Sequence, residues 1–358
     1  MIRRHVLTII FWLPLGLSHF TTTAYGCEDL VKAVYGISSK SAPLNDLKPS
    51  AIPAWLQKHG INAVFTSARE APPVLQALKK QGMACYQEFT VFTGRTLYRE
   101  NPNWRPITAA GKEMKPDGWY HGLCPNQPEL RRKRLDEFAN RLQNPHLDGI
   151  WLDFIRYPVR WEGKTPRIED SCFCEVCLKK FEDFMNGMEL KGNTTADKAA
   201  FILNNHLQKW MAFRVESICS WVKEAKTIRD QKRPDVQLGL FLVPWLKEDY
   251  DNAILRIVGQ DVNALSQYID IVSPMVYHGL CYREPAWVAK VTKAIKRKSG
   301  KPVWPIIQAT SQPDTLSAEE FQQTMRIASQ ASQTGVILFT AGHIQKENRW
   351  DQVQAVWK

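Results

Sequence analysis

The chain is expected to fold as an α/β protein, a single (β/α)8 TIM barrel with eight parallel strands that alternate with helices. Three observations predict this class. Eight apolar, β-rich segments recur along the 358 residues. Helical patterns separate most of them. One segment, Asp148–Pro158 (DGIWLDFIRYP), is a mostly apolar run that carries an acid at its C-terminal end. A doubly wound open sheet is the alternative, but no glycine-rich phosphate loop follows the first segment.

The elements follow in order along the chain. The predicted strands are residues 32–38, 62–67, 83–90, 147–157, 236–245, 269–278, 302–310 and 335–341. The predicted helices are residues 51–59, 72–81, 128–143, 195–229, 251–267, 285–298, 318–333 and 350–357. Two connections are unusually long, residues 92–126 after the third strand and 159–193 after the fourth. Loops that follow barrel strands lie on the C-terminal face, so these two should form a lid over the barrel mouth.

The N-terminus has the pattern of an export signal. Arg3 and Arg4 precede an apolar stretch, and small residues at Ala24 and Gly26 fit cleavage before Cys27. Residues 1–26 are therefore predicted to be a signal peptide, and residues 27–358 a single glycoside-hydrolase-like barrel domain. Cys27 also permits lipid attachment, so a periplasmic, a secreted and a lipid-anchored protein of the bacterial envelope all stay open, the last with a membrane tether through Cys27.

Charge and aromatic content narrow the class of partner. The formal net charge is +11, and loss of Arg3 and Arg4 with the signal lowers it to +9. This balance favours acidic surfaces such as anionic polysaccharide or lipid headgroups. Nucleic acid is not expected, because the chain is exported and its basic residues are scattered. The 13 tryptophans provide flat faces that stack on sugar rings, although most tryptophans in any globular protein belong to its core.

Acidic side chains near three predicted strand ends are the catalytic candidates. Asp153 ends the fourth strand, Glu88 lies near the end of the third, and Glu248 follows the fifth. A buried acid is unfavourable unless it is paired or used. Pairing with Arg156, or capping of the next segment, would be a purely structural role for Asp153. A pair of carboxylates at a barrel mouth is what the cleavage of a glycosidic bond requires.

Polar and aromatic side chains at other strand ends are candidates for substrate binding. His343, after the eighth strand, and His278 are expected to be structural or to hydrogen-bond sugar more often than to shuttle protons. The substrate-binding candidates are Arg156, Trp245, Tyr277, His278 and Gln308.

Four phrases of the sequence carry a family resemblance: LCPNQPE at residues 123–129, DGIWLDFIRYP at 148–158, GQD at 259–261 and YIDIVSPMVY at 268–277. They resemble bacterial exported glycoside-hydrolase-like TIM-barrel proteins. The resemblance implies a barrel that acts on polysaccharide or oligosaccharide as a glycosidase hydrolysing O-glycosyl bonds, with the carboxylate of Asp153 as the foremost catalytic candidate.

Two departures from better-understood relatives restrict the mechanism. Ile155 stands where the chitinase-type signature has its acidic Glu, and Gln308 stands where the clan of family 42 β-galactosidases has its nucleophile. An amylase-like scheme fits best, with Asp153 as nucleophile or electrostatic stabiliser and Glu248 as acid; Glu88 is the alternative acid. A barrel that binds carbohydrate without turnover is the second functional class.

Three cysteines within six residues form a cluster, Cys172, Cys174 and Cys177. Their spacing resembles the structural zinc cluster of family 42 β-galactosidases, and this resemblance implies Cys124, in the preceding long loop, as the fourth ligand. Four thiolates would hold a structural Zn²⁺, and no cofactor is required for catalysis. Disulfides are the alternative, because export places the chain in an oxidising compartment. Both interpretations place Cys124 close to the other three.

Overall fold

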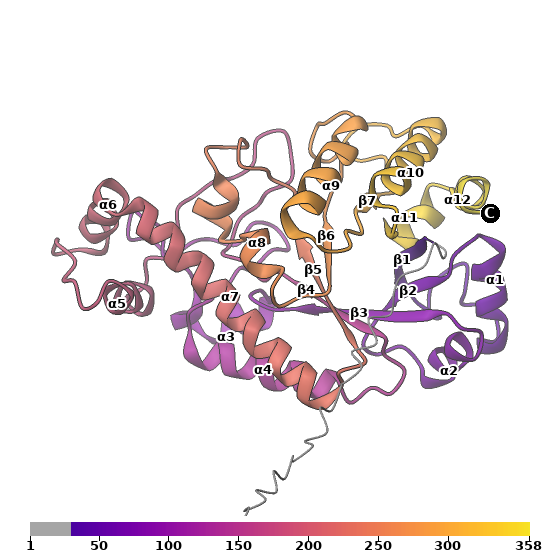
Figure 1. Ribbon diagram of the computed structural model, residues 1–358, viewed down its shortest axis with the longest axis horizontal. Coiled ribbons are helices and arrows are strands. Elements are labelled where there is room, and N and C mark those ends of the chain that lie inside the picture. Colours follow the sequence, from indigo (N-terminus) through magenta and orange to yellow (C-terminus); the bar gives the residue numbers. More distant parts are fainter. Residues whose placement is uncertain (1–29) are drawn as a thin grey trace, which may run out of the picture.

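The computed structural model describes residues 30–358 and contains one eight-stranded parallel barrel (Figure 1). The strands are β1 (Val31–Ile37), β2 (Ala63–Thr66), β3 (Ala84–Thr90), β4 (Gly149–Asp153), β5 (Gln237–Leu242), β6 (Ile271–Pro274), β7 (Ile306–Gln308) and β8 (Gly335–Phe339). The hydrogen-bonded order runs β6-β5-β4-β3-β2-β1-β8-β7. Parallel bridges from Val272 to Val303 and from Met275 to Ile306 join the two remaining edges. The predicted fold class is confirmed, and every predicted strand overlaps an observed one.

Helices alternate with the strands and surround the barrel. They are α1 (Ile52–Lys58), α2 (Pro72–Lys80), α4 (Pro128–Arg141), α7 (Leu207–Lys232), α8 (Val262–Leu265), α9 (Ala286–Ser299), α10 (Ala318–Ser332) and α12 (Trp350–Trp357). Shorter elements lie in the connections: α3 (Arg95–Glu100), α5 (Glu175–Phe184), α6 (Thr195–Asn205), α11 (Ala341–Lys346), the 3-10 turns η1 (Pro49–Ala51) and η2 (Pro102–Trp104), and a π-helical turn η3 (Ile254–Val258).

Two predicted helices are each divided in the structure. The segment predicted at 195–229 breaks at His206, whose φ of −135° is not helical, into α6 and α7. The segment predicted at 251–267 contains Gly259 at a φ of 74°, which ends η3 before α8 begins. Apolar spacing continues across both breaks, so periodicity alone does not reveal where the backbone leaves the helix.

The barrel interior is filled by aromatic rings. Trp151 and Trp304 stack with their ring centroids 5.3 Å apart, and the Trp151 Nε1–H donates to Ser273 Oγ at 2.9 Å. Glycines make room for these rings: a Cβ atom added at Gly239 would lie 2.2 Å from Trp151, and one at Gly335 would lie 2.7 Å from Trp304. Close packing of this kind leaves the barrel solid below its mouth.

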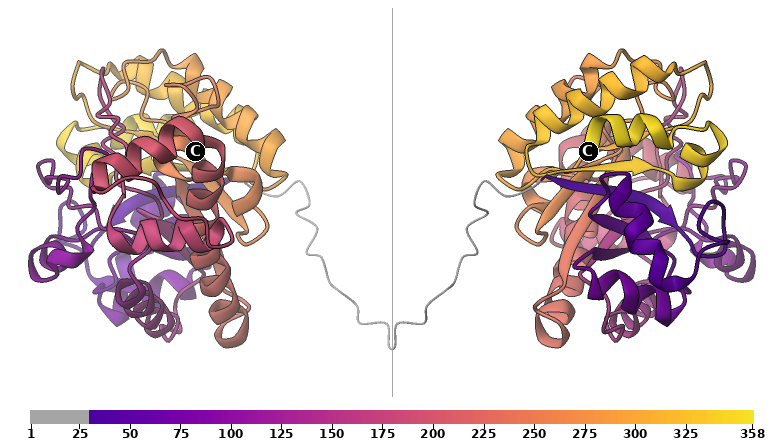
Figure 2. Two further views of the ribbon diagram at one scale, coloured as in Figure 1. Left: turned by 90° about the vertical axis from the view of Figure 1, so that its left-hand side faces the viewer. Right: turned by 90° about the vertical axis from the view of Figure 1, so that its right-hand side faces the viewer.

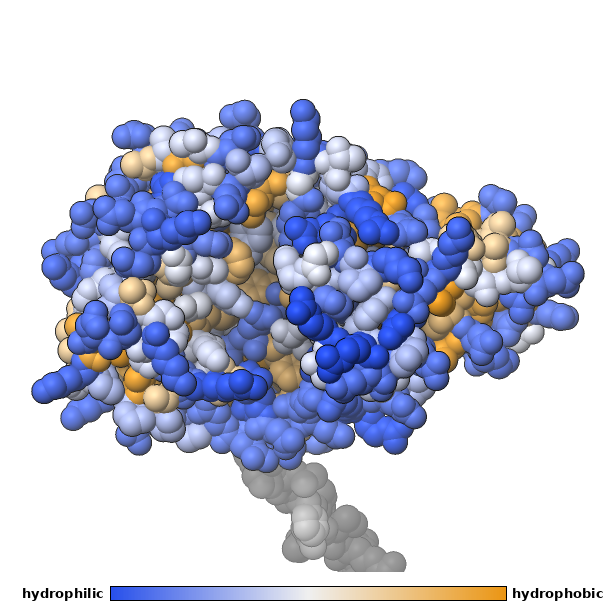
Figure 3. Space-filling view, turned by 180° about the vertical axis from the view of Figure 1, so that it is seen from behind, coloured by the Kyte–Doolittle hydropathy of each residue, from blue (hydrophilic) through white to orange (hydrophobic). Residues whose placement is uncertain are grey.

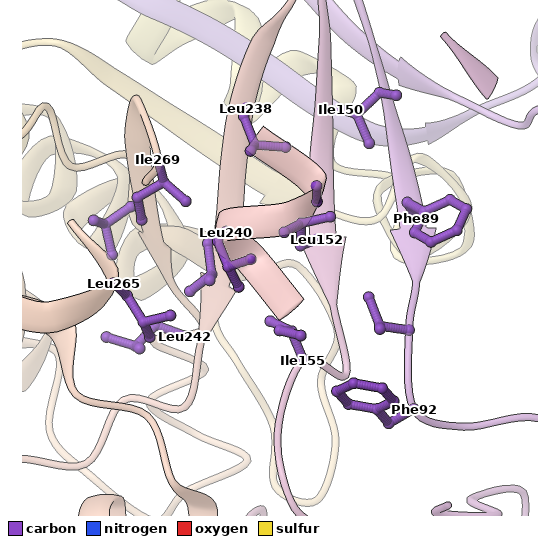
Figure 4. Close-up of a cluster of buried hydrophobic side chains, with 14 of the residues drawn as sticks. Phe89, Phe92, Ile150, Leu152, Ile155, Leu238, Leu240, Leu242, Leu265 and Ile269 are labelled. Atoms are coloured by element: carbon purple, nitrogen blue, oxygen red, sulfur yellow. The ribbon is translucent and has the colours of Figure 1, made fainter. Parts of the chain in front are cut away.

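Strand residues of the opposite parity point outward and pack under the helices. Figure 4 shows Ile150 and Leu152 of β4 on this outer side together with Phe89 of β3. The Phe89 ring contacts Phe138 of α4 and Trp221 of α7, with centroids 5.5 and 6.4 Å away. The alternation predicted for β4 is therefore present, and it places the side chains of Trp151 and Asp153 toward the barrel axis.

The long connections after β3 and β4 lie together at one end of the molecule. Helices α5 and α6 project at this end, away from α1 and α12 (Figures 1 and 2). The bridge between Thr108 and Ser171 joins the two connections. The space-filling view shows a mostly hydrophilic face on which apolar residues gather toward the α5–α6 end (Figure 3).

The predicted signal peptide (residues 1–26) and Cys27 lie outside the described residues. Within residues 30–358, no helix combines the length and the apolar character that crossing a membrane requires.

Candidate active site

Asp153 ends β4 at the barrel mouth and is partly buried. Its Oδ1 accepts a hydrogen bond from the backbone N–H of Phe154 at 2.6 Å. The pKa of Asp153 is raised to about 8, chiefly by burial and next by the negative charge of Glu88, against the opposing effects of Arg156 and the Phe154 hydrogen bond. The carboxyl group of Asp153 is therefore held largely protonated at neutral pH.

Glu88 lies on β3, the strand next to β4, and its carboxylate also belongs to the mouth. Its two oxygens accept hydrogen bonds from two hydroxyl groups, Tyr35 of β1 and Thr90, the latter at 2.7 Å. Burial and the neighbouring carboxylate of Glu88 raise the pKa of the Tyr35 hydroxyl, which therefore remains a donor. Hydroxyl groups from two strands, β1 and β3, therefore hold the Glu88 carboxylate in place.

The two acids thus occupy contrasting environments on adjacent strands. In the strand register, Glu88 lies level with Trp151, and Thr90 lies level with Asp153. Asp153 lies in surroundings that disfavour its charge, and Glu88 accepts hydrogen bonds from hydroxyl groups. Two carboxyl groups on neighbouring strands can divide the roles of acid and of nucleophile or base.

Aromatic rings and one arginine form the wall around Asp153. Tyr277 is buried between Trp161 and Phe339, with centroid distances of 5.8 and 5.0 Å. The Arg156 guanidinium is also buried and lies 5.0 Å from the centre of the Phe154 ring. Its Nη1 donates to the Tyr120 hydroxyl and to the Val159 carbonyl, and its Nε has no protein partner in the described part of the chain.

Two other predicted site residues, Glu248 and Trp245, make contacts away from this wall. Glu248 is 60% exposed in its side chain, and its carboxylate lies 3.4 Å from Lys290 of α9. A hydrogen bond from its own backbone N–H, and then this ion pair, lower the pKa of Glu248. Trp245 is buried against Tyr250, and with Glu248 it lines a separate groove beside α9.

His278 and Gln308 are buried in structural contacts. The His278 Nε2 lies 3.0 Å from the Glu320 carboxylate of α10, and burial lowers the pKa of His278. Gln308 accepts the Leu280 N–H at 2.9 Å and donates to the Thr310 carbonyl at 3.1 Å, so it ties together the connections after β6 and β7. Both interactions satisfy polar groups that would otherwise be buried without partners.

Sequence reasoning did not identify Tyr35 or Glu162. The side chain of Tyr35 points toward the barrel axis from β1. Alternation along this strand was the sequence signal that could have identified it. Glu162, in the long connection after β4, contributes to the raised pKa of Asp153, and its carboxylate lies 3.3 Å from Arg160. No strand pattern reaches this loop, so its position is visible only in three dimensions.

The four cysteines of the predicted cluster come together between the two long connections. The Sγ atoms of Cys124, Cys172, Cys174 and Cys177 all lie within 4.8 Å of one another. Cys124 Sγ is 3.7 Å from Cys174 Sγ and 3.4 Å from Cys177 Sγ, and each of the four is a free cysteine. These separations exceed a disulfide bond of about 2.05 Å. Four thiols at this spacing could hold a metal ion.

Groups around the cluster donate hydrogen bonds to its sulfur atoms. The Ile107 N–H donates to Cys172 and the Asn126 side chain to Cys177, both at 3.3 Å. Donors of this kind stabilise thiolates that coordinate a metal. The same Asn126 amide also donates to the Tyr157 hydroxyl at 2.8 Å, which links the cluster to the segment that follows Asp153.

Comparisons with known proteins find similar structures but no similar sequences. No protein-family model matches the chain, and no curated protein is similar to it. The glycoside hydrolase domain of PgaB (BpsB) from Bordetella bronchiseptica has a similar structure, with a TM-score of 0.67 and 14% identity over 92% of this chain and 99% of that one.

Two β-galactosidases are also similar in structure. The enzyme from the psychrophilic Marinomonas ef1 gives a TM-score of 0.64 with 12% identity over 87% of this chain and 54% of its own. Gan42B, a family 42 β-galactosidase from G. stearothermophilus, gives 0.65 with 11% identity over 92% and 56%. The chain thus spans about half the length of each β-galactosidase. The shared fold is the barrel found in these glycoside hydrolases.

Proposed function

We propose that this protein is a glycoside hydrolase that cleaves a polysaccharide or oligosaccharide at the mouth of its barrel. One observation carries the proposal: two carboxyl groups on adjacent strands, Asp153 and Glu88, lie at the mouth, where burial and the charge of Glu88 raise the pKa of Asp153 and two hydroxyl groups donate to Glu88. Hydrolysis of a glycosidic bond needs one carboxylic acid and one carboxylate. The glycoside hydrolases that share the fold support this assignment.

In this mechanism Asp153 is the general acid and Glu88 the nucleophile or base. Asp153 protonates the departing glycosidic oxygen, because burial keeps its proton in place until the bond breaks. Glu88 attacks the sugar carbon or activates water, and the hydroxyl groups of Tyr35 and Thr90 position its oxygens for this role. This assignment exchanges the roles expected from sequence, and it prefers Glu88 to Glu248, which pairs with Lys290 at the surface.

The surrounding side chains supply substrate binding. Tyr277 and Trp161 are buried and support Phe339, the partly exposed ring of the three, on which a sugar ring can rest. Arg156 lies beside Asp153, where its charge opposes the rise in the Asp153 pKa and stabilises the carboxylate that forms when the acid loses its proton.

Substitution of each candidate acid tests the assignment. Purified wild type, Asp153→Asn, Glu88→Gln and Glu248→Gln are compared on a panel of polysaccharides, with circular dichroism as the control for folding. We expect the first two variants to lose about 10²-fold or more in kcat, because each lacks a proton-transfer group, and Glu248→Gln to keep its activity. Full activity in Asp153→Asn would refute the mechanism.

A carbohydrate-binding barrel without turnover is the second candidate function. It is favoured by the open cavity lined by Tyr35, Phe65 and Glu88, which could hold a sugar without any change in covalent bonds. Binding of a glycan by the wild type, with no release of reducing ends, would support this function over hydrolysis.

We further propose that the cysteine cluster binds a structural Zn²⁺. Four thiolates at about 2.3 Å from zinc lie about 3.8 Å from one another, close to the Sγ separations of 3.4 and 3.7 Å observed for Cys124. The metal would hold the β3 and β4 connections together over the mouth. Metal analysis should give one zinc per chain in the wild type and none in Cys172→Ser, whereas Cys219→Ser, outside the cluster, should keep it. Zinc-free wild type with two disulfides would contradict the proposal.

Export through residues 1–26 is also a proposal, and so is a lipid tether at Cys27. The mass of the mature protein from a bacterial host distinguishes the outcomes, because cleavage before Cys27 and lipid addition to Cys27 each change it by a defined amount. A mature protein that begins at Met1 would refute both.

A further inference from the structure

An open groove runs from the barrel mouth outward over the ends of β2 and β3. The inner cavity is lined by Tyr35, Phe65 and Glu88, and the outer one by residues of α4 and its C-terminal end. The two cavities have volumes of about 360 and 500 Å³. They share Ala68, Glu88, Thr90 and Arg141, so they are continuous.

The groove is open because the connection above it is short. Residues 67–71 alone join β2 to α2, whereas the long connections after β3 and β4 carry the lid. A polymer that reached Glu88 could therefore continue outward across this rim, over Asn140 and Asn144 at the C-terminal end of α4. The groove is suited to an extended chain of sugars.

Arg141 is the cation that both cavities share. It is half-buried at the last position of α4, and its guanidinium lies 5.9 Å from the centre of the Phe89 ring. Its Nη1 donates to Gln87 Oε1 and to the Glu88 carbonyl, each at 3.3 Å. Its Nε and Nη2 have no hydrogen-bond acceptor, and no carboxylate forms an ion pair with it, among residues 30–358.

A second arginine of the same helix shows the contrast. Arg134 lines the outer cavity too, but all three of its nitrogens are used: Nε donates to Val91 O at 2.9 Å, Nη2 to Thr93 O at 2.9 Å, and Nη1 to the Glu137 carboxylate at 2.5 Å. Arg134 is thus satisfied by the fold, and Arg141 retains two donor nitrogens beside the groove.

We infer that this groove binds an acidic polysaccharide and that Arg141 binds the carboxylate of one of its uronic acid units. A guanidinium held by one nitrogen, with two others free, matches the paired oxygens of a carboxylate, and charge-assisted bonds of this geometry are the strong ones. Burial lowers the pKa of Arg141, while the charge of Glu88 opposes this effect. The inference rests on the proposed function, because it names the substrate class of the same site.

Binding measured without turnover tests the inference. Asp153→Asn serves as the parent, and calorimetry measures its affinity for hexamers of galacturonate, of guluronate and of hyaluronan, each beside its carboxyl-reduced, neutral form. We expect at least one acidic hexamer to bind, and its neutral form to bind about tenfold or more weakly. Adding Arg141→Gln should cause a similar loss for the acidic hexamer and little change for the neutral one.

Lys133→Gln is the matched control, because it removes one positive charge from the same helix at a side chain that pairs with Glu137 and lines neither cavity. It should change affinity by less than about twofold, in keeping with an exposed charge. No binding of any acidic hexamer, or equal losses in the two variants, would overturn the inference. Hydrolysis of a neutral glycan with Arg141→Gln fully active would overturn it too, and would leave the proposed function intact. If an acidic hexamer bound through Arg141 but the wild type did not hydrolyse it, the inference would stand and the proposed function would be overturned.

Discussion

Replacement of Asp153 by Asn should stabilise the protein, increasingly so as the pH rises. Burial and the charge of Glu88 raise the pKa of Asp153 from 3.8 to about 8. Between these two pH values the folded state holds a proton that the unfolded state has lost, so the free energy of unfolding falls as pH rises. Asn cannot ionise and escapes this penalty, and its side-chain oxygen can still accept the Phe154 N–H.

The magnitude follows from the same shift. A rise from 3.8 to about 8 corresponds to an upper limit of about 6 kcal/mol. Asp153 is partly exposed, so water screens its charge, and we expect a gain of about 1–3 kcal/mol at pH 8. The gain should shrink toward pH 4, where both states become protonated, and should level off above about pH 8.

Urea unfolding at a series of pH values measures this difference. Wild type and Asp153→Asn are compared between pH 4 and 9, with Asp46→Asn as the control because Asp46 is exposed. The control should change the free energy of unfolding by less than about 0.5 kcal/mol at every pH. A variant less stable than wild type at pH 8, or a difference that does not depend on pH, would show that the environment of Asp153 does not disfavour its charge.

Three further results are expected. If Asp153 is the acid, kcat should fall as the pH rises through about 8, as initial rates across a pH series would show; a rate that increases over this range would contradict the role. Tyr35→Phe removes a hydrogen bond that positions the Glu88 carboxylate, so kcat should fall about tenfold or more with circular dichroism unchanged; an unchanged kcat would exclude this positioning role. Gly239→Ala places a methyl group 2.2 Å from the buried tryptophan of β4 and should cost about 1–3 kcal/mol or more in chemical denaturation. Gly342→Ala, in helix α11 with one atom at 3.6 Å, should be neutral or stabilising, and equal effects of the two glycine substitutions would contradict the packing argument.

The fold could be predicted because its signals are local and repeated. Apolar segments of strand length alternate with helical patterns, so an error in one segment leaves the count of eight intact. The errors arose where backbone geometry changes without a change in periodicity, at His206 and Gly259. The position of Asp153 at the mouth was also predictable, because alternation along β4 fixes which side chains face the axis.

The site was only partly predictable. Alternation along a strand fixes the direction of the side chains on that strand, but not of those in the loop that follows it. Glu88 and Asp153 lie on β3 and β4, and both reach the mouth. Glu248 follows β5 by several residues, and there the chain turns toward α9, where Lys290 pairs with it. Neighbouring residues can also point in opposite directions. Tyr277 packs against Phe339, whereas His278, the next residue, faces Glu320 of α10.

The different surroundings of Glu88 and Asp153 support the catalytic role proposed for Asp153. Glu88 accepts two hydroxyl groups, so the fold is able to satisfy a carboxylate at the mouth. Asp153, one strand away, accepts only the neighbouring backbone N–H among the described residues, and its ionisation is opposed by Glu88 itself. A neutral Asn would fill the same space and keep that hydrogen bond without the charge. An acidic side chain that makes the protein less stable than its neutral isostere would, beside a carboxylate that lines an open cavity, is explained if its proton is used. The stability and the kinetics of Asp153→Asn therefore test the same claim. The group that destabilises the fold at pH 8 should be the group whose removal abolishes turnover.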